Sequence, residues 1–157
     1  MISLQRNGKR GAALVEFALV ATLLLLLAAG AGDFGRIFTE AIAVKSGSAT
    51  AALYGSQRNT RSGDLAGMTA LAEGDAVDAG SITVTAAQYC ACPSGNGTAN
   101  WTEIPCSEFL ATTCNNAYGS PRAYVQVNAT KNFTTVIKMP GVPSGTTINQ
   151  TTWMRVR

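Results

Sequence analysis

The feature that most limits what this chain can fold into is an apolar run near its N-terminus. Residues 12–32 contain one charged side chain, that of Glu16, and three cations precede the run at Arg6, Lys9 and Arg10. As a helix, 21 residues are about 31 Å long, which is enough to cross the hydrocarbon core of a bilayer. We therefore expect residues 12–32 to span a membrane, with basic residues 1–11 in the cytoplasm and the rest outside.

A cleaved secretory signal is the main alternative for this run. Residues 17–29 form an apolar stretch that is followed by small residues, as in a signal peptide. Two details favour a retained helix: Glu16 interrupts the start of the stretch, and an apolar pattern of helical spacing continues beyond Gly32. That pattern comprises Phe34, Ile37, Phe38, Ala41, Ile42, Ala49, Ala52 and Leu53. We predict one long helix over residues 12–57, apolar all round in its first half and amphipathic in its second.

The remaining residues, 58–157, predict a small α+β domain. Helical spacing indicates a short helix over residues 64–77 that ends near Gly80. A period of two then favours strands over residues 81–89, 123–137 and 146–156. If the middle strand breaks near residues 128–132, the sheet has four strands instead of three. The expected fold class is α+β, with the long N-terminal helix packed on a small antiparallel sheet of three or four strands.

Four cysteines lie in the part of the chain that the predicted topology places outside the cytoplasm: Cys90, Cys92, Cys106 and Cys114. That compartment and the absence of histidine favour two disulfides over a zinc site. A bridge between Cys90 and Cys92 would be strained. Two connectivities remain: Cys90–Cys106 with Cys92–Cys114, or Cys90–Cys114 with Cys92–Cys106. Either one tethers a loop within residues 90–114.

Two groups of residues in this domain have a structural and a binding interpretation. The loop carries three aromatic residues, Trp101, Phe109 and Tyr118, which we expect to cover the sheet rather than bind a partner. Five basic residues lie in a stretch without Asp or Glu: Arg122, Lys131, Lys138, Arg155 and Arg157. We expect them to form one solvated face of the sheet, with a docking patch for an acidic partner as the alternative.

Charge and residue type argue against nucleic-acid binding and against catalysis. The twelve basic residues less the three before residue 12 leave nine, which balance nine acidic residues, so we expect no broad basic surface for a nucleic acid. Without histidine or a G-x-S-x-G motif the usual general base and nucleophile are missing. The G-x-G-x-x-G pattern at residues 30–35 lacks the βαβ unit of a dinucleotide site, and its glycines mark a weak or bent helical segment instead. Glu73, Asp75 and Asp78 lack the spacing of a calcium loop. We expect a protein that is not an enzyme, with no cofactor and no metal.

The N-terminal sequence carries a family resemblance. Residues 10–20, RGAALVEFALV, followed by DFGR at residues 33–36, resemble the start of TadE-like pseudopilins of tight-adherence (Flp-type IV) pilus systems. The resemblance implies a pilin-like fold and cleavage by a prepilin peptidase between Gly11 and Ala12, which makes Glu16 and Phe17 the fifth and sixth mature residues. It also implies a place in the bacterial inner membrane, with the C-terminal domain in the periplasm or carried into the extracellular pilus. The implied partners are the prepilin peptidase, other pseudopilins, the major pilin and the inner-membrane assembly platform.

The spacing of the implied cleavage site has a chemical consequence. Cleavage creates an α-amino group on Ala12, one helical turn from Glu16. Each charge is costly to bury alone, and a pair between Glu16 of one subunit and the amine of a neighbour removes both penalties. We expect Glu16 and Phe17 to set register during pilus assembly. The alternatives are an unprocessed single-pass membrane protein and a secreted, disulfide-bonded binding protein.

Overall fold

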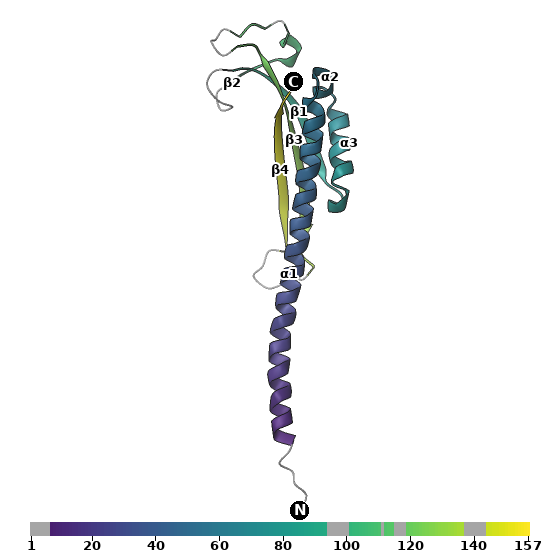
Figure 1. The fold of residues 1–157 in the computed structure, drawn as a ribbon, viewed down its shortest axis with the longest axis vertical. Helices are drawn as coiled ribbons and strands as arrows, with labels where there is room; N and C mark the ends of the chain where they lie inside the picture. Colours follow the sequence, from purple (N-terminus) through teal and green to yellow (C-terminus); the bar gives the residue numbers. More distant parts are fainter. Residues whose placement is uncertain (1–6, 94–100, 111, 115–118, 137–143) are drawn as a thin grey trace, which may run out of the picture.

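One long helix dominates the structure, a computed structural model that describes residues 7–93, 101–110, 112–114, 119–136 and 144–157. Helix α1 runs from Asn7 to Ser56, 50 residues, and continues without interruption through Gly30, Gly32 and Gly35. The helix is therefore not interrupted at the glycines where we expected a weak or bent segment. In Figure 1 the first half of α1 projects away from the rest of the chain, and the second half lies along the sheet.

The domain that packs on α1 consists of a short helical arm and one sheet. Helices α2 (Asn59–Ser62), α3 (Leu65–Asp75) and η2 (Val77–Ala79) precede β1 (Thr83–Pro93), β2 (Trp101–Ile104), η3 (Cys106–Glu108), β3 (Arg122–Thr134) and β4 (Gly145–Arg155). The strands pair antiparallel in the order β2-β1-β3-β4. The predicted α+β class, a long N-terminal helix with a small antiparallel sheet, is confirmed.

Strand β3 is continuous where a break was considered, across residues 128–132. Two of its asparagines accept hydrogen bonds from threonines opposite them on β4: Thr151 Oγ1 donates to Asn128 at 3.4 Å, and Thr147 Oγ1 donates to Asn132 at 3.0 Å. Asparagine disfavours strands when its side chain forms hydrogen bonds with the nearby backbone. Here the threonines opposite Asn128 and Asn132 take up these side chains instead, so the strand continues. The fourth strand is instead β2, within the segment that we expected to be a loop.

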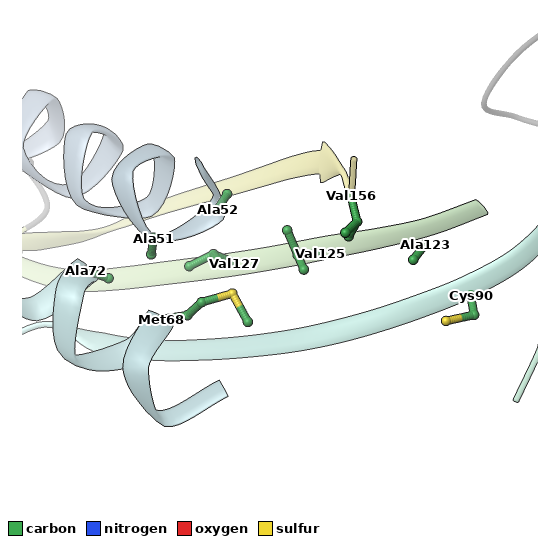
Figure 2. Close-up of a cluster of buried hydrophobic side chains, with 9 residues drawn as sticks. All are labelled: Ala51, Ala52, Met68, Ala72, Cys90, Ala123, Val125, Val127 and Val156. Carbon is green, nitrogen blue, oxygen red and sulfur yellow. The ribbon is translucent and has the colours of Figure 1, made fainter. Parts of the chain in front are cut away.

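The helices cover one face of the sheet, α1 over β3 and β4, and α3 over β1. Figure 2 shows the upper core, in which small residues of α1 meet Met68 of α3 and valines of β3. A second cluster lies nearer the membrane half of α1 and includes Val44, Phe133 and Ile148. Alanine, glycine and serine on the inner face of α1 let its backbone come close to α3 and to β3.

Two contacts fix the end of the domain farthest from the N-terminus. Asp64 caps α3 by accepting a hydrogen bond from the backbone N–H of Gly67 at 3.0 Å, and the hydroxyl of Tyr54 on α1 donates to the same carboxylate at 2.8 Å. The Gly67 and Tyr54 hydrogen bonds hold the pKa of Asp64 below its ordinary value, and the bond to Asp64 raises the pKa of Tyr54. The backbone N–H of Arg157 donates to the carbonyl of Ser56 at 3.0 Å, which ties the end of β4 to the end of α1.

Two disulfides join the β1 end to the segment that follows β2. They are Cys90–Cys106, with Cα atoms 5.1 Å apart, and Cys92–Cys114, with Cα atoms 5.5 Å apart, so the structure has the first of the two connectivities left open by the sequence. Phe109 packs against the upper core, as expected of a covering residue. The side chain of Trp101 and all of Tyr118 lie outside the described residues.

Candidate functional site

The residues of the expected processing site lie inside α1, because the helix already begins at Asn7. Gly11 and Ala12 are both exposed. A Cβ atom added to Gly11 would meet nothing within 4 Å, so packing within the described structure does not require a glycine there. Any requirement for glycine at this position must come from a molecule that binds the chain.

Glu16 lies on a part of α1 that contacts no other element of the domain. It is exposed, and it has no hydrogen bond or ion pair with any residue that the structure describes. Its neighbour Phe17 is 71% exposed. In the described chain, α1 is the one helix long and apolar enough to cross a membrane, with a mean hydropathy of 2.5 over its most apolar window and none of that window buried. A carboxylate in such a segment lacks any intramolecular compensation for leaving water.

The second half of α1 has two apolar faces where the sequence indicated one. Small residues, among them Ala51 and Ala52, face the core and are fully buried. Four larger residues point away from it, Phe34, Phe38, Ile42 and Leu53, and we call them the outer stripe. These four side chains are 54–69% exposed. Large apolar side chains that are exposed on one side of a helix are typical of surfaces that meet another molecule.

A charged group that we call the collar, Asp33, Arg36 and Glu40, marks the point where α1 meets the sheet. Arg36 forms ion pairs with Asp33 at 3.4 Å and with Glu40 at 3.7 Å, and its guanidinium lies over the ring of Phe133, 5.3 Å from the centroid. Asp33 also accepts a hydrogen bond from the backbone N–H of Val136 at 3.3 Å. The collar thus holds the lower end of β3 to α1 next to the predicted membrane surface.

The sequence contained a signal for the collar that we did not use. Charges of alternating sign spaced three and four residues apart face one another on a helix, and Asp33, Arg36 and Glu40 have that spacing. The residues that complete the group, Phe133 at the end of β3 and Val136 just after it, are about 100 residues away along the chain. No local sequence pattern predicts a contact between residues so far apart.

The described residues offer little for other chemistry. Within them, no three His, Cys, Asp or Glu side chains are grouped so that they could hold a metal ion. Asp33 is occupied by Arg36 and by the backbone N–H of Val136, whereas Glu40 meets Arg36 through Oε1 and its Oε2 is buried without a hydrogen-bond partner among the described residues. The arrangement is suited to anchoring and packing of helices.

Comparison with known proteins gives a family match on the part of the chain that carries these features. Residues 11–53 match the family described as TadE-like protein, which confirms the resemblance over less than half of the chain. The matched segment begins at Gly11 and includes Glu16, the collar and the outer stripe. No curated protein and no solved structure gave a significant match.

Proposed function

We propose that this chain, whose α1 matches the TadE-like family, is a pseudopilin or minor pilin subunit that takes part in assembly of a Tad (Flp-type) pilus after a prepilin peptidase cuts between Gly11 and Ala12. The observation that carries the proposal is Glu16, an exposed carboxylate with no partner among the described residues, on a helix long and apolar enough to cross a membrane and at a fixed distance from the expected cut. The family is structural rather than catalytic and is associated with other pilus components, which supports a role in assembly.

The proposed mechanism starts with a charge that cleavage creates. The new α-amino group on Ala12 is cationic at neutral pH. Glu16 of the same chain lies only one turn away, but both groups project from a helix that leaves them facing lipid. When helices associate, Glu16 of one subunit accepts the amine of a neighbour's Ala12, and the two desolvation costs fall together. Cleavage would therefore switch the subunit from membrane storage to assembly.

The outer stripe gives this association a second point of contact. Glu16 and Phe34 are 18 residues apart, or about five turns of an α-helix, so they lie on the same side of α1. A neighbouring helix that meets Glu16 would also cover Phe34 and Phe38. Burial of large apolar side chains stabilises such a contact by about 1.5–3 kcal/mol each once they have left water.

The proposal places α1 across the bacterial inner membrane, with the leader in the cytoplasm and the disulfide-bonded domain in the periplasm. The apolar helix and the family match support a membrane and pilus association. The proposed partners are the prepilin peptidase, other pseudopilins, the major pilin and the inner-membrane assembly platform. The lipid bilayer holds the subunit before assembly.

The mass of the mature N-terminus tests this function. We expect the chain purified from cells with a prepilin peptidase to begin at Ala12, and a Gly11→Ala variant to keep its leader. Gly30→Ala is the matched control, because a Cβ atom at Gly30 also meets nothing within 4 Å, and it should be processed normally. An intact start would favour an unprocessed membrane protein, and a start near Ala31 would favour a secreted protein; either result contradicts the proposal.

A further inference from the structure

An open pocket lies at the end of the domain farthest from the membrane half of α1. Its volume is about 500 Å³, and it lies between the last turn of α1 and the end of β4. Figure 1 shows the two elements ending at the same height, where the C-terminus of the chain is marked. We call this the distal pocket, and it is lined by Leu53, Ser56, Gln57, Met154, Arg155 and Arg157.

The lining of the distal pocket combines positive charge with apolar surface. Arg155 and Arg157 are exposed, and neither forms an ion pair with a described residue. Leu53 is 54% exposed, and Met154 is half-buried beside it. The one solvated basic face expected from the sequence does not form, because Arg122 and Lys131 are nine residues apart on β3 and so point to opposite faces of the sheet. Lys138 lies outside the described residues.

The same molecule carries a surface of the opposite charge, which we call the acidic ridge. It consists of Glu73, Asp75, Val77 and Asp78 at the end of α3 and on η2, and all four side chains are exposed. Asp75 is held in place by hydroxyl donors on α1, Ser46 at 2.7 Å and Thr50 at 3.1 Å. Val77 is 70% exposed between the acids. An apolar side chain flanked by carboxylates therefore faces solvent, just as an apolar patch flanked by guanidinium groups does in the distal pocket.

The two surfaces lie on opposite flanks of the domain. The distal pocket is at the β4 edge, since α1 packs over β3 and β4, and the acidic ridge is on α3, which packs over β1. Figure 1 shows β4 and α3 on either side of α1. Surfaces on opposite flanks cannot meet within one chain, but they can meet between parallel neighbours. A contact of this kind is heterologous, and repeated contacts extend into rings or helical filaments.

We propose that the distal pocket of one copy of this chain binds the acidic ridge of a second copy around the free edge of β4, with Val77 between Leu53 and Met154 on the helix side, and with Glu73 and Asp78 facing Arg157 and, across the strand edge, Arg155. The inference rests on the proposed function, because it requires copies that stand side by side in one bilayer or one filament. Charge complementarity at such a rim selects the partner and its orientation.

The heights of the two surfaces along α1 agree with the Glu16 pairing. The ridge is level with Ser46 and Thr50, and the pocket is level with Leu53 and Gln57, about seven residues or 10 Å farther from the membrane. The neighbour that supplies the ridge must therefore be raised by about 10 Å. Pairing of Glu16 with a neighbour's Ala12 raises that neighbour by four residues, or about 6 Å, in the same direction. Long arginine and glutamate side chains can bridge the difference of about 4 Å between the two values.

Charge reversal in the full-length chain tests the contact. Two differently tagged copies are expressed together in bacterial membranes, solubilised in a mild non-ionic detergent, and assayed for recovery of one copy with the other. We expect the variant R155E/R157E and the variant E73K/D78K each to lower recovery about tenfold, as loss and reversal of several surface ion pairs implies. The chain that carries all four substitutions should recover close to the original level, because the charges are again complementary.

Arg122 provides the control, because it is an arginine of the same domain that does not line the pocket. The variant Arg122→Glu should leave recovery unchanged. A fourfold variant that stays low, or an R155E/R157E variant that associates normally, would overturn the contact between copies. A chain that is processed at Ala12 but shows no rescue leaves the proposed function standing without this contact. Rescue in a chain that keeps its leader would support the contact between copies and contradict the proposed function.

Discussion

At the scale of single residues, Glu16 is where charge and environment conflict most. It is exposed on the apolar half of α1 without a partner among the described residues, and under the proposed function its charge is the cost that assembly would remove. We expect Glu16→Leu to insert into the membrane at least as well as the original chain, since a carboxylate in a spanning helix costs up to about 2.5–3.5 kcal/mol. Cleavage between Gly11 and Ala12 by the prepilin peptidase should not change. Association with other pilus subunits, measured by co-purification, should fall by at least about tenfold.

A conservative variant completes that experiment. Glu16→Asp keeps the charge on a side chain that is one methylene shorter, and it should retain part of the association. If Glu16→Leu co-purifies with pilus subunits as well as the original chain, the carboxylate has no role in register.

Asp64 gives the residue scale a pH dependence. Its pKa is held below the ordinary value of 3.8 by the N–H of Gly67 and the hydroxyl of Tyr54. A group with a depressed folded pKa contributes stability above the unfolded pKa and loses that contribution as pH falls through the folded value. The contribution of Asp64 should therefore be constant from neutral pH to about pH 5 and should disappear below pH 3.8.

Two substitutions isolate this effect in thermal unfolding of the full chain in detergent. Asn is also a good N-cap but does not titrate, so Asp64→Asn should unfold with a weaker dependence on pH between about pH 5 and pH 2 than the original chain. Asp64→Ala should unfold at a lower temperature already at neutral pH. Parallel pH profiles for Asp64→Asn and the original chain would rule out this assignment.

Residue type and spacing were sufficient to single out some of these residues and not others. Glu16 and the four cysteines stand out because each is unusual for its surroundings. The cysteine pairing depends on strand register: β1 pairs with β2 so that Cys90 lies opposite Ile104, two residues before Cys106. The cap at Asp64 depends on Tyr54, which is on another helix. Such contacts follow from packing and leave no pattern in the sequence.

At the scale of elements, glycine decides how closely α1 and α3 approach. A Cβ atom on Gly47 would lie 2.5 Å from the carbonyl oxygen of Ala72 and 3.0 Å from Cβ of Ala76. The first of these is backbone and cannot move away alone. We expect Gly47→Ala to lower the free energy of unfolding by about 1–3 kcal/mol, as overpacking of a tight interface does. Denaturant titration of the full chain in detergent measures the change.

Gly35→Ala is the matched control on the same helix. A Cβ atom there meets nothing within 4 Å, so this substitution should be neutral or should raise helix stability by up to about 1 kcal/mol. Equal effects at both positions would mean that the spacing of α1 and α3 is not limited by Gly47.

Elements with strong periodicity could be predicted from the sequence. Which of their residues face the core could not. Helix α3 ends at Asp75 with η2 following, close to the predicted end, and Gly80 adopts a positive φ of 71° where the chain turns toward β1. Strand β2 has four residues in a cysteine-rich segment, which is too short for an alternating pattern. In α1, periodicity showed that apolar residues recur, but only the packed structure shows which of them turn inward: Val44 and Ile37 do, whereas Phe38 does not. Where α3 comes closest, at Gly47, there is no room for a larger side chain, and farther down α1 Phe34, Phe38 and Ile42 are exposed.

At the scale of the whole molecule, the chain separates three tasks along one axis. The first half of α1 is long and apolar enough to act as a membrane anchor, the collar joins α1 to the segment that ends β3, and the sheet and α3 present opposite charges on two flanks. The sequence predicted the anchor and the small domain, because hydropathy and strand periodicity are local. It did not predict the segregation of charge, because Arg155 and Arg157 reach their place beside α1 only through the antiparallel path of β3 and β4.

The same axis makes the disulfides a reporter of membrane orientation. Cys90–Cys106 and Cys92–Cys114 should form only if the domain reaches an oxidising compartment. Orientation depends on the cations that precede the apolar run. We expect the original chain to resist alkylation by a thiol-reactive polymer until it is reduced. Replacement of Arg6, Lys9 and Arg10 by glutamine should raise the alkylated fraction several-fold, since part of the population then leaves its domain in the cytoplasm.

Lys45→Gln is the control for this orientation assay, because it removes a cation from the domain side of the membrane. It should leave the cysteines fully protected. The readout does not depend on leader cleavage or on assembly, since it records the compartment in which the domain folded. A triple glutamine variant that stays fully oxidised would show that Glu16, the apolar run and the rest of the chain fix the orientation without the basic leader. The leader charges would then have to serve recognition by the peptidase instead.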